Sequence, residues 1–131
     1  MKLLDTDTCI AILRGNGSVI ERRAAEQDSV KTSWVTAAEL YFGAAKSVAP
    51  DDNRLVVDRF LATMEVLRPD LPAAQAFGEA KALLQRAGMP VADADLMIAG
   101  IAIANGATVI TGNRPHFARI PGLAIEDWIR P

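Results

Sequence analysis

Five short runs of apolar and β-branched residues divide the chain, and segments with helical spacing separate each run from the next. The runs occupy residues 2–5, 29–34, 65–67, 107–110 and 123–125. Alternation of buried strands with helices is typical of a parallel sheet that helices cover on both faces. We therefore expect an α/β protein, a three-layer α/β/α sandwich with a mainly parallel central sheet.

The segments between these runs have the residue spacing of helices. Apolar residues at helical spacing predict a helix over residues 72–87 with Gly88 as its end, and a buried helix that begins at Ala92 or Asp93. The T-x-x-E spacing of residues 36–39 is that of a capping box, which predicts a helix start. Further helices are expected over residues 8–13, after Ser18 and from Pro50.

Length and composition limit the possible functions. A chain of 131 residues predicts one domain, residues 1–131. The net charge of −2 excludes a generally basic protein that coats nucleic acid, but it allows a local basic patch. Cys9 is the only cysteine, which excludes a disulfide framework and a cysteine-based zinc site. No apolar run reaches about 18 residues, so we expect a cytoplasmic protein without a membrane anchor.

Polar side chains follow several of the predicted strands or begin the helices after them. Asp5 ends the first run, Glu39 and Asp95 lie near predicted helix starts, and Asn113 follows the fourth run. The carboxyl ends of parallel strands meet at one edge of a sheet, where ligands and catalytic groups gather. We therefore expect these four side chains to lie together.

Three carboxylates at one edge predict a metal site. Clustered carboxylates repel one another, and the usual compensation is a divalent cation. Ligands that are all oxygen atoms favour Mg²⁺ or Mn²⁺. Such an ion activates a bound water and stabilises charge on a phosphodiester. The residue types therefore favour metal-assisted phosphodiester hydrolysis.

Five motifs, in the order in which they occur along the chain, resemble those of the VapC-type toxins, a group of PIN-domain ribonucleases. The first, LLDTD at residues 3–7, resembles the family's LLDTN with Asp7 in place of asparagine. VTAAELYFG at residues 35–43 and DLMIA at residues 95–99 resemble the second and third blocks. VITGN at residues 109–113, then IPGL and Trp128, resemble the closing blocks. Together they span nearly the whole chain.

The resemblance implies roles for particular residues. Asp5 and Asp95 would be metal ligands, and Glu39 would be a further ligand or a group that orients water. Asn113 stands in the region where many PIN domains carry a fourth acid. Its amide supplies no charge, although it can bond a metal-bound water or simply serve as a turn residue.

The resemblance also implies partners. The toxins of this family cleave RNA, commonly tRNA or ribosomal RNA, with Mg²⁺ or Mn²⁺. A small antitoxin neutralises them through a C-terminal segment that wraps the toxin. Homodimers are usual in the family.

Each acid also has a purely structural explanation. Asp5 could cap the helix after it, Glu39 could complete the capping box, and Asp95 could favour the helix dipole. Asp93 and Asp7 could cap helices or partly replace the missing fourth acid.

Other notable residues have mostly structural interpretations. Cys9 is expected in the core and His116 in a surface loop rather than as a base. Trp34 and Trp128 are expected in core or edge packing. Three arginines near the predicted loops either contact phosphates or are simply solvated: Arg14, Arg114 and Arg119.

A haloacid-dehalogenase-like phosphatase is one rival interpretation. LDTDT at residues 4–8 fits that family's h-D-x-D-x-T opening, with Asp5 as nucleophile and Asp7 as acid and base. The later order does not fit. The acids at residues 93–95 precede Thr111, whereas those enzymes place them downstream, and no lysine follows Thr111.

A PIN-like domain that only binds an antitoxin or RNA is a second rival. The neutral amide in place of the fourth acid is its main support. The other three acids are all present, which favours an enzyme.

Overall fold

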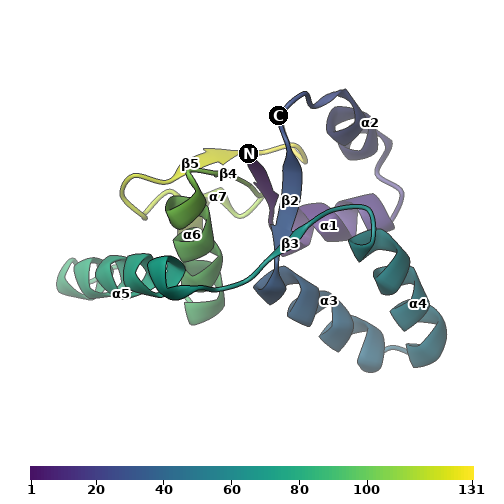
Figure 1. The fold of residues 1–131 in the computed structure, drawn as a ribbon, viewed down its shortest axis with the longest axis horizontal. Coiled ribbons are helices and arrows are strands. Elements are labelled where there is room, and N and C mark those ends of the chain that lie inside the picture. The colour runs from purple at the N-terminus through teal and green to yellow at the C-terminus, as the bar shows by residue number, and fades with distance from the viewer.

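The computed structural model describes residues 1–131 and contains one five-stranded sheet, in which every neighbouring pair is parallel (Figure 1). The strand order is β3-β2-β1-β4-β5. Each strand lies within one residue of its expected range at both ends. The strands are β1 (Lys2–Leu4), β2 (Val30–Ser33), β3 (Val66–Leu67), β4 (Thr108–Ile110) and β5 (Ala124–Glu126).

The register of the central strands aligns their carboxyl ends. Leu4 of β1 pairs with Thr32 of β2 and with Ile110 of β4. The next residue of each strand therefore stands in one row at the edge of the sheet. These three residues are Asp5, Ser33 and Thr111.

Helices cover both faces of the sheet. One layer holds α1 (Thr6–Leu13), α2 (Gly17–Ala25), α3 (Trp34–Ala45) and α4 (Pro50–Leu61). The other holds α5 (Leu71–Arg86), α6 (Asp93–Asn105) and the short α7 (Arg114–Phe117). This arrangement confirms the three-layer α/β/α sandwich.

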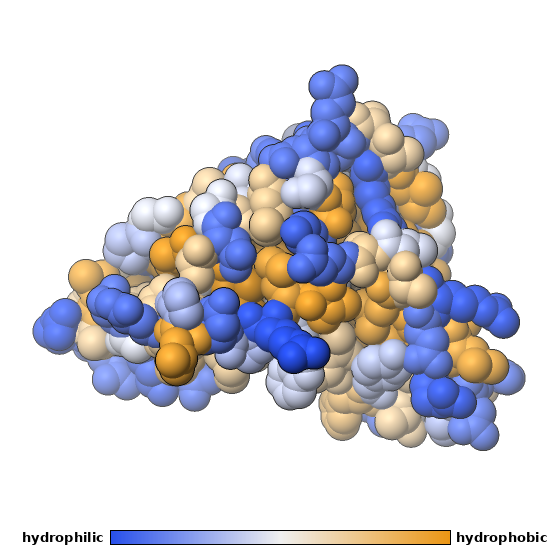
Figure 2. Space-filling model, in the orientation of Figure 1, coloured by the Kyte–Doolittle hydropathy of each residue, from blue (hydrophilic) through white to orange (hydrophobic).

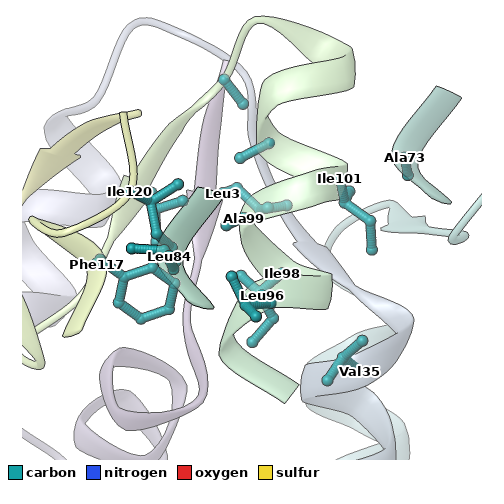
Figure 3. Close-up of a cluster of buried hydrophobic side chains, with 13 residues drawn as sticks. Leu3, Val35, Ala73, Leu84, Leu96, Ile98, Ala99, Ile101, Phe117 and Ile120 are labelled. Atoms are coloured by element: carbon teal, nitrogen blue, oxygen red, sulfur yellow. The ribbon is translucent and has the colours of Figure 1, made fainter. Parts of the chain in front are cut away.

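The core is divided into two clusters by the sheet. Leu3 and Val109 belong to the cluster on the α5–α6 side, whereas Leu4 and Ile110 belong to the cluster on the α1–α4 side. This division follows from the alternation of side chains along a strand. Figure 3 shows Leu84, Phe117 and Ile120 gathered in the first cluster.

Helix α6 is buried in its middle, as its apolar sequence predicts, but Met97 and Ile103 are exposed at 37% and 38%. Ile98, Ala99, Ile101 and Ala102 have no exposed surface. Gly100 lies so close to α5 that a Cβ atom there would stand 2.6 Å from the backbone oxygen of Ala73. The two helices are therefore packed backbone to backbone at this point.

Two helix starts differ from the sequence prediction because their caps come from other residues. Helix α1 begins at Thr6 rather than at residue 8, and the Asp5 side chain accepts a hydrogen bond from the Thr6 N–H. Helix α2 begins at Gly17, capped by Asn16 rather than by Ser18.

The capping box predicted at residues 36–39 is wrong. Helix α3 begins at Trp34, directly after β2, and the Ser33 hydroxyl accepts from the Thr36 N–H at 3.1 Å. Because Ser33 already caps the helix, Glu39 lies beyond the first turn. Its carboxylate is exposed and makes no contact with the helix start.

The two tryptophans have different environments. Trp128 is 3% exposed and packs in the α1–α4 cluster, as expected. Trp34 is 56% exposed, which excludes the core position among the two that were expected for it. The reason is its position at the uncovered carboxyl edge, just beyond β2. Cys9 is buried in the core, as predicted.

The surface mixes apolar patches with charged side chains (Figure 2). No helix of the structure is long and apolar enough to cross a membrane.

Candidate active site

Asp5 is held rigidly at the carboxyl edge of β1. Its side chain is nearly buried, because the residue is only 5% exposed. Oδ1 accepts from the Thr6 N–H at 2.8 Å, and Oδ2 accepts from the Thr111 hydroxyl at 2.7 Å. Two hydrogen bonds from separate elements therefore fix the orientation of the carboxylate.

The Asp5 carboxylate is in an unfavourable electrostatic environment. The pKa of Asp5 is raised from 3.8 to about 7. Burial is the largest cause, the charges of Asp7 and Asp95 also raise the pKa, and the hydrogen bonds from Thr111 and Thr6 partly offset this rise. No lysine or arginine forms an ion pair with it. Asp5 is therefore a buried acid without a cationic partner.

Glu39 is linked to Asp5 through Thr6. The Thr6 hydroxyl donates to Glu39 Oε1 at 2.8 Å, and its backbone N–H donates to Asp5. The Thr36 hydroxyl lies 3.2 Å from the Thr6 hydroxyl. Thr6 therefore orients two of the predicted site carboxylates, a role that the sequence analysis did not identify.

Asp95 lies in the first turn of α6, and its side chain is 20% exposed. Its Oδ2 atom stands 3.3 Å from Nδ1 of His116, on α7. Its charge also contributes to the raised pKa of Asp5. The structure thus brings the first and third predicted acids to the same edge.

Thr111 and Asn113 connect Asp5 to His116. The Asn113 N–H donates to the Thr111 hydroxyl at 2.9 Å, and Thr111 donates in turn to Asp5. The Asn113 amide stands 2.9 Å from His116 Nδ1. A continuous series of polar contacts therefore runs from Asp5 to Asp95. His116, which was expected in a surface loop, lies on α7. The contact of Thr111 with Asp5 was not predicted from the sequence.

Asp7 supports the loop after β4. Its Oδ2 atom accepts from the Gly112 N–H at 2.9 Å, and burial raises its pKa. A Cβ atom on Gly112 would lie 2.9 Å from that oxygen, so the approach requires glycine. Because Asp5 caps α1, the alternative of Asp7 as a helix cap is wrong.

Asp93 lies apart from this site. Ala92 is the N-cap residue of α6, no side chain caps the helix there, and Asp93 pairs with Lys81 at 2.9 Å. The structure therefore contradicts its predicted capping role. Among the arginines, Arg14 lines a hollow that Glu39 borders, whereas Arg119 donates to the Pro90 carbonyl.

The residues of the site fit a divalent cation by their chemistry. Asp5 supplies a fixed, buried carboxylate whose charge no protein cation balances, and Asp95 supplies a second. No three acidic, imidazole or thiol groups converge closely enough to hold a metal by themselves. Asp5, Glu39 and Asp95 therefore do not form the three-carboxylate site that the sequence predicts. Mg²⁺ typically takes one or two carboxylates and keeps several waters.

The chain matches known proteins over nearly its whole length. The sequence profile of the PIN domain matches residues 2–123. The tRNA(fMet)-specific endonuclease VapC of Salmonella typhimurium is 43% identical over 127 residues, which cover 96% of both chains. Ribonuclease VapC2 of Rickettsia felis is 33% identical over 129 residues, again 96% of both chains.

Solved structures agree with these sequence matches. The chain superposes on the crystal structure of DNA-bound VapBC from Salmonella typhimurium with a TM-score of 0.92, at 42% identity over 97% of each chain. VapBC2 from Rickettsia felis, bound to a DNA fragment from its promoter, gives a TM-score of 0.91 at 30% identity over 97% of this chain and 98% of that one. The chain therefore belongs to the PIN-domain family and, within it, to the VapC ribonucleases.

Proposed function

We propose that this ribonuclease hydrolyses phosphodiester bonds of tRNA with Mg²⁺ or Mn²⁺ held by Asp5 and Asp95. Glu39 would be a further ligand or would orient a water, and one end of the Asn113 amide could contact a water at the metal while the other faces His116. The observation that carries the proposal is the buried Asp5 carboxylate without a cationic partner, beside a second carboxylate at the same sheet edge. Residues 1–131 act as one domain, in the cytoplasm.

The side chains of the site have separate tasks in this reaction. A bound divalent ion supplies an activated water and neutralises charge on the phosphate. The hydrogen bonds from Thr6 and Thr111 hold Asp5 in one orientation, so the ligand does not have to reorganise. The Thr6 hydroxyl also holds Glu39 beside the carboxyl edge of the sheet, where its exposed carboxylate can reach a water.

The relatives suggest the substrate. The enzymes of Salmonella typhimurium and Shigella flexneri are named as tRNA(fMet)-specific endonucleases, at 43% and 40% identity. We therefore propose tRNA(fMet) as the substrate of this chain. Single-stranded loops of RNA are the regions in which proteins read sequence, so we expect the cut in a loop.

The proposed partner is a small antitoxin of the VapB type. Three of the solved structures that the chain resembles are VapBC complexes, and two of these three are bound to DNA. A hollow of about 340 Å³ between α1, α3 and α4 is lined mainly by apolar residues and bordered by Arg14 and Glu39. An antitoxin segment bound in this hollow would lie next to Glu39 and therefore next to the proposed active site. We also propose a homodimer as the toxin's own assembly.

The test is cleavage of purified tRNA(fMet) by the purified protein with Mg²⁺ or Mn²⁺. We expect specific cleavage by the wild type, its loss with a chelator, and its loss in Asp5→Asn and Asp95→Asn. Asp93→Asn is the matched control, because Asp93 lies two residues from Asp95 but pairs with Lys81 outside the site. Intact RNA with the wild type in both metals contradicts the proposal.

The phosphatase alternative has its own test. In that mechanism Asp7 is the acid and base, so Asp7→Asn abolishes activity. In the proposed mechanism Asp7 only holds the Gly112 N–H, which an asparagine oxygen also accepts. Full RNA cleavage by Asp7→Asn, without inhibition by beryllofluoride, therefore excludes the phosphatase.

A further inference from the structure

His116 is the only histidine of the chain, and one nitrogen of its ring faces two polar groups of the site. Nδ1 stands 3.3 Å from Oδ2 of Asp95 and 2.9 Å from the side-chain amide of Asn113. The ring is about half exposed, with 48% of the side chain accessible. A surface histidine with no role would not require two contacts at the same nitrogen.

The position of the ring proton follows from these contacts. If Nδ1 carried no proton, its lone pair would face a carboxylate oxygen, and the two would repel. With a proton on Nδ1, the ring donates a charge-assisted hydrogen bond to Asp95. The structure has the Asn113 amide nitrogen Nδ2 at 2.9 Å from Nδ1. An amide N–H cannot donate to a protonated nitrogen, so a proton on Nδ1 requires the Asn113 amide to be rotated by 180°, with its oxygen toward the ring. Amide orientation and ring tautomer are assigned from such a network.

We propose that His116 is a positioning residue for Asp95, acting through an Nδ1–H that is shared between Asp95 Oδ2 and, after rotation of its amide, Asn113 Oδ1. The hydrogen bond occupies one oxygen of the Asp95 carboxylate and leaves the other for the metal. This inference rests on the proposed function, because it assumes that Asp95 is a ligand. It also assigns Asn113 a task, which is to orient the histidine ring.

A hydrogen-bond donor suits the position beside Asp95 better than another carboxylate would. Asp5 already experiences the charges of Asp7 and Asp95, and a further carboxylate would increase the repulsion. An imidazole N–H instead adds no negative charge to the site, and its hydrogen bond holds one of the proposed metal ligands, Asp95, in place. Hydrogen bonds of this kind from outside the ligand set orient ligands and tune metal affinity, typically by about 10- to 100-fold.

The first test reads the tautomer directly, in metal-free protein that need not be active. A two-bond proton–nitrogen correlation spectrum at mildly alkaline pH contains the signals of only one histidine. We expect a protonated Nδ1 and a bare Nε2, whereas an imidazole free in water prefers the proton on Nε2. Asp95→Ala should shift the ring toward the Nε2–H form, and the control Asp93→Ala should not. A wild-type ring with its proton on Nε2 overturns the proposal.

The second test compares three variants by Mn²⁺ affinity, measured by electron paramagnetic resonance without RNA. His116→Asn places an amide nitrogen where Nδ1 stood, whereas His116→Gln places it where Nε2 stood. We expect His116→Asn to retain affinity within about threefold of the wild type, and His116→Gln and His116→Ala to lose about tenfold or more. In RNA cleavage the two weakened variants should recover at high Mn²⁺ concentration.

The outcomes separate the two proposals. If the wild type binds no Mn²⁺ and cleaves no RNA, the proposed function fails and the role of His116 fails with it. If the wild type binds Mn²⁺ and cleaves RNA but all three variants bind Mn²⁺ equally well, only the role of His116 is wrong. A greater loss in His116→Asn than in His116→Gln also contradicts it, because the contact would then run through Nε2.

Discussion

At the scale of single residues, the site is built around an acid that the fold itself does not neutralise. Asp5 has lost most of its contact with water, and two acids rather than a base lie near it. Such a group destabilises the metal-free protein whenever it is ionised. Strained or unbalanced groups of this kind are typical of functional sites.

The raised pKa of Asp5 predicts a pH-dependent effect of Asp5→Asn on stability. The folded pKa of about 7 exceeds the ordinary value of 3.8, so the folded state binds the proton more tightly than the unfolded state. The stabilisation that the protonated Asp5 carboxyl gives to the folded state is complete below about pH 4 and is lost as the pH rises through 7. Without metal, Asp5→Asn should therefore raise the free energy of unfolding near pH 8, by on the order of 2 kcal/mol.

Denaturant unfolding at a series of pH values measures this effect. The difference between Asp5→Asn and the wild type should shrink toward zero near pH 4. Added Mn²⁺ should stabilise the wild type and leave the variant unchanged. A variant that is less stable than the metal-free wild type at pH 8 contradicts the electrostatic account of Asp5.

Asp7 permits a second prediction, by comparison of two substitutions. Asp7→Asn retains an oxygen for the Gly112 N–H, whereas Asp7→Ala leaves that N–H without its partner. We expect Asp7→Ala to lower the free energy of unfolding by about 1–3 kcal/mol and Asp7→Asn to change it little. Equal losses in both variants, measured by denaturant unfolding, would show that the charge of Asp7 matters more than its oxygen.

At the scale of elements, the sequence predicts the strands better than the helix starts. The strands are short apolar runs whose ends local composition defines, and Asp5 and Asp95 follow from their positions along the chain. Helices α1 and α3 begin directly after strands, capped by the last strand-edge residues Asp5 and Ser33. The cap by Asp5 is one of the alternatives that the sequence offers, whereas the T-x-x-E spacing points away from Ser33.

The contacts within the site depend on the pairing of distant strands. The bond between Thr111 and Asp5 spans 106 residues and requires the register of β1 against β4. The approach of His116 to Asp95 requires α7 to pack beside α6. Neither pairing is encoded in a local pattern, so the sequence does not identify Thr6, Thr111 and His116 as the groups that contact the predicted acids.

The packing of α5 against α6 predicts opposite effects of two glycine substitutions. Gly100→Ala places a Cβ atom 2.6 Å from a backbone oxygen of α5, so the helices must separate. We expect a loss of about 1–3 kcal/mol of unfolding free energy. Gly78→Ala in α5 meets no atom within 4 Å and should stabilise by about 0.5–1 kcal/mol, because alanine favours the helix. A stabilising Gly100→Ala, measured by denaturant unfolding, contradicts this packing.

At the scale of the whole molecule, the carboxyl edge of the sheet that carries Asp5 and the apolar hollow between α1, α3 and α4 lie next to each other. Glu39 takes part in both, because it borders the hollow and bonds Thr6. A partner in the hollow can therefore block the edge without contact with Asp5 itself.

The hollow predicts a substitution that separates antitoxin binding from catalysis. Val56 lines the hollow and is 44% exposed, so Val56→Glu should weaken binding of an antitoxin peptide at least about tenfold by burying a charge. RNA cleavage should be unchanged. Val48→Glu is the control, since Val48 is fully exposed outside the hollow. Calorimetric binding by Val56→Glu at wild-type affinity contradicts this placement of the partner.

We predict that Asp5 and Asp95 hold a divalent ion at the carboxyl edge of the sheet. Anomalous X-ray scattering from a crystal grown with Mn²⁺ tests it most directly. We predict an anomalous peak within about 2.2 Å of a carboxylate oxygen of each of these two residues. A peak held only by other acids, such as the exposed pair Asp51 and Asp52, or no peak at the edge, would contradict the account.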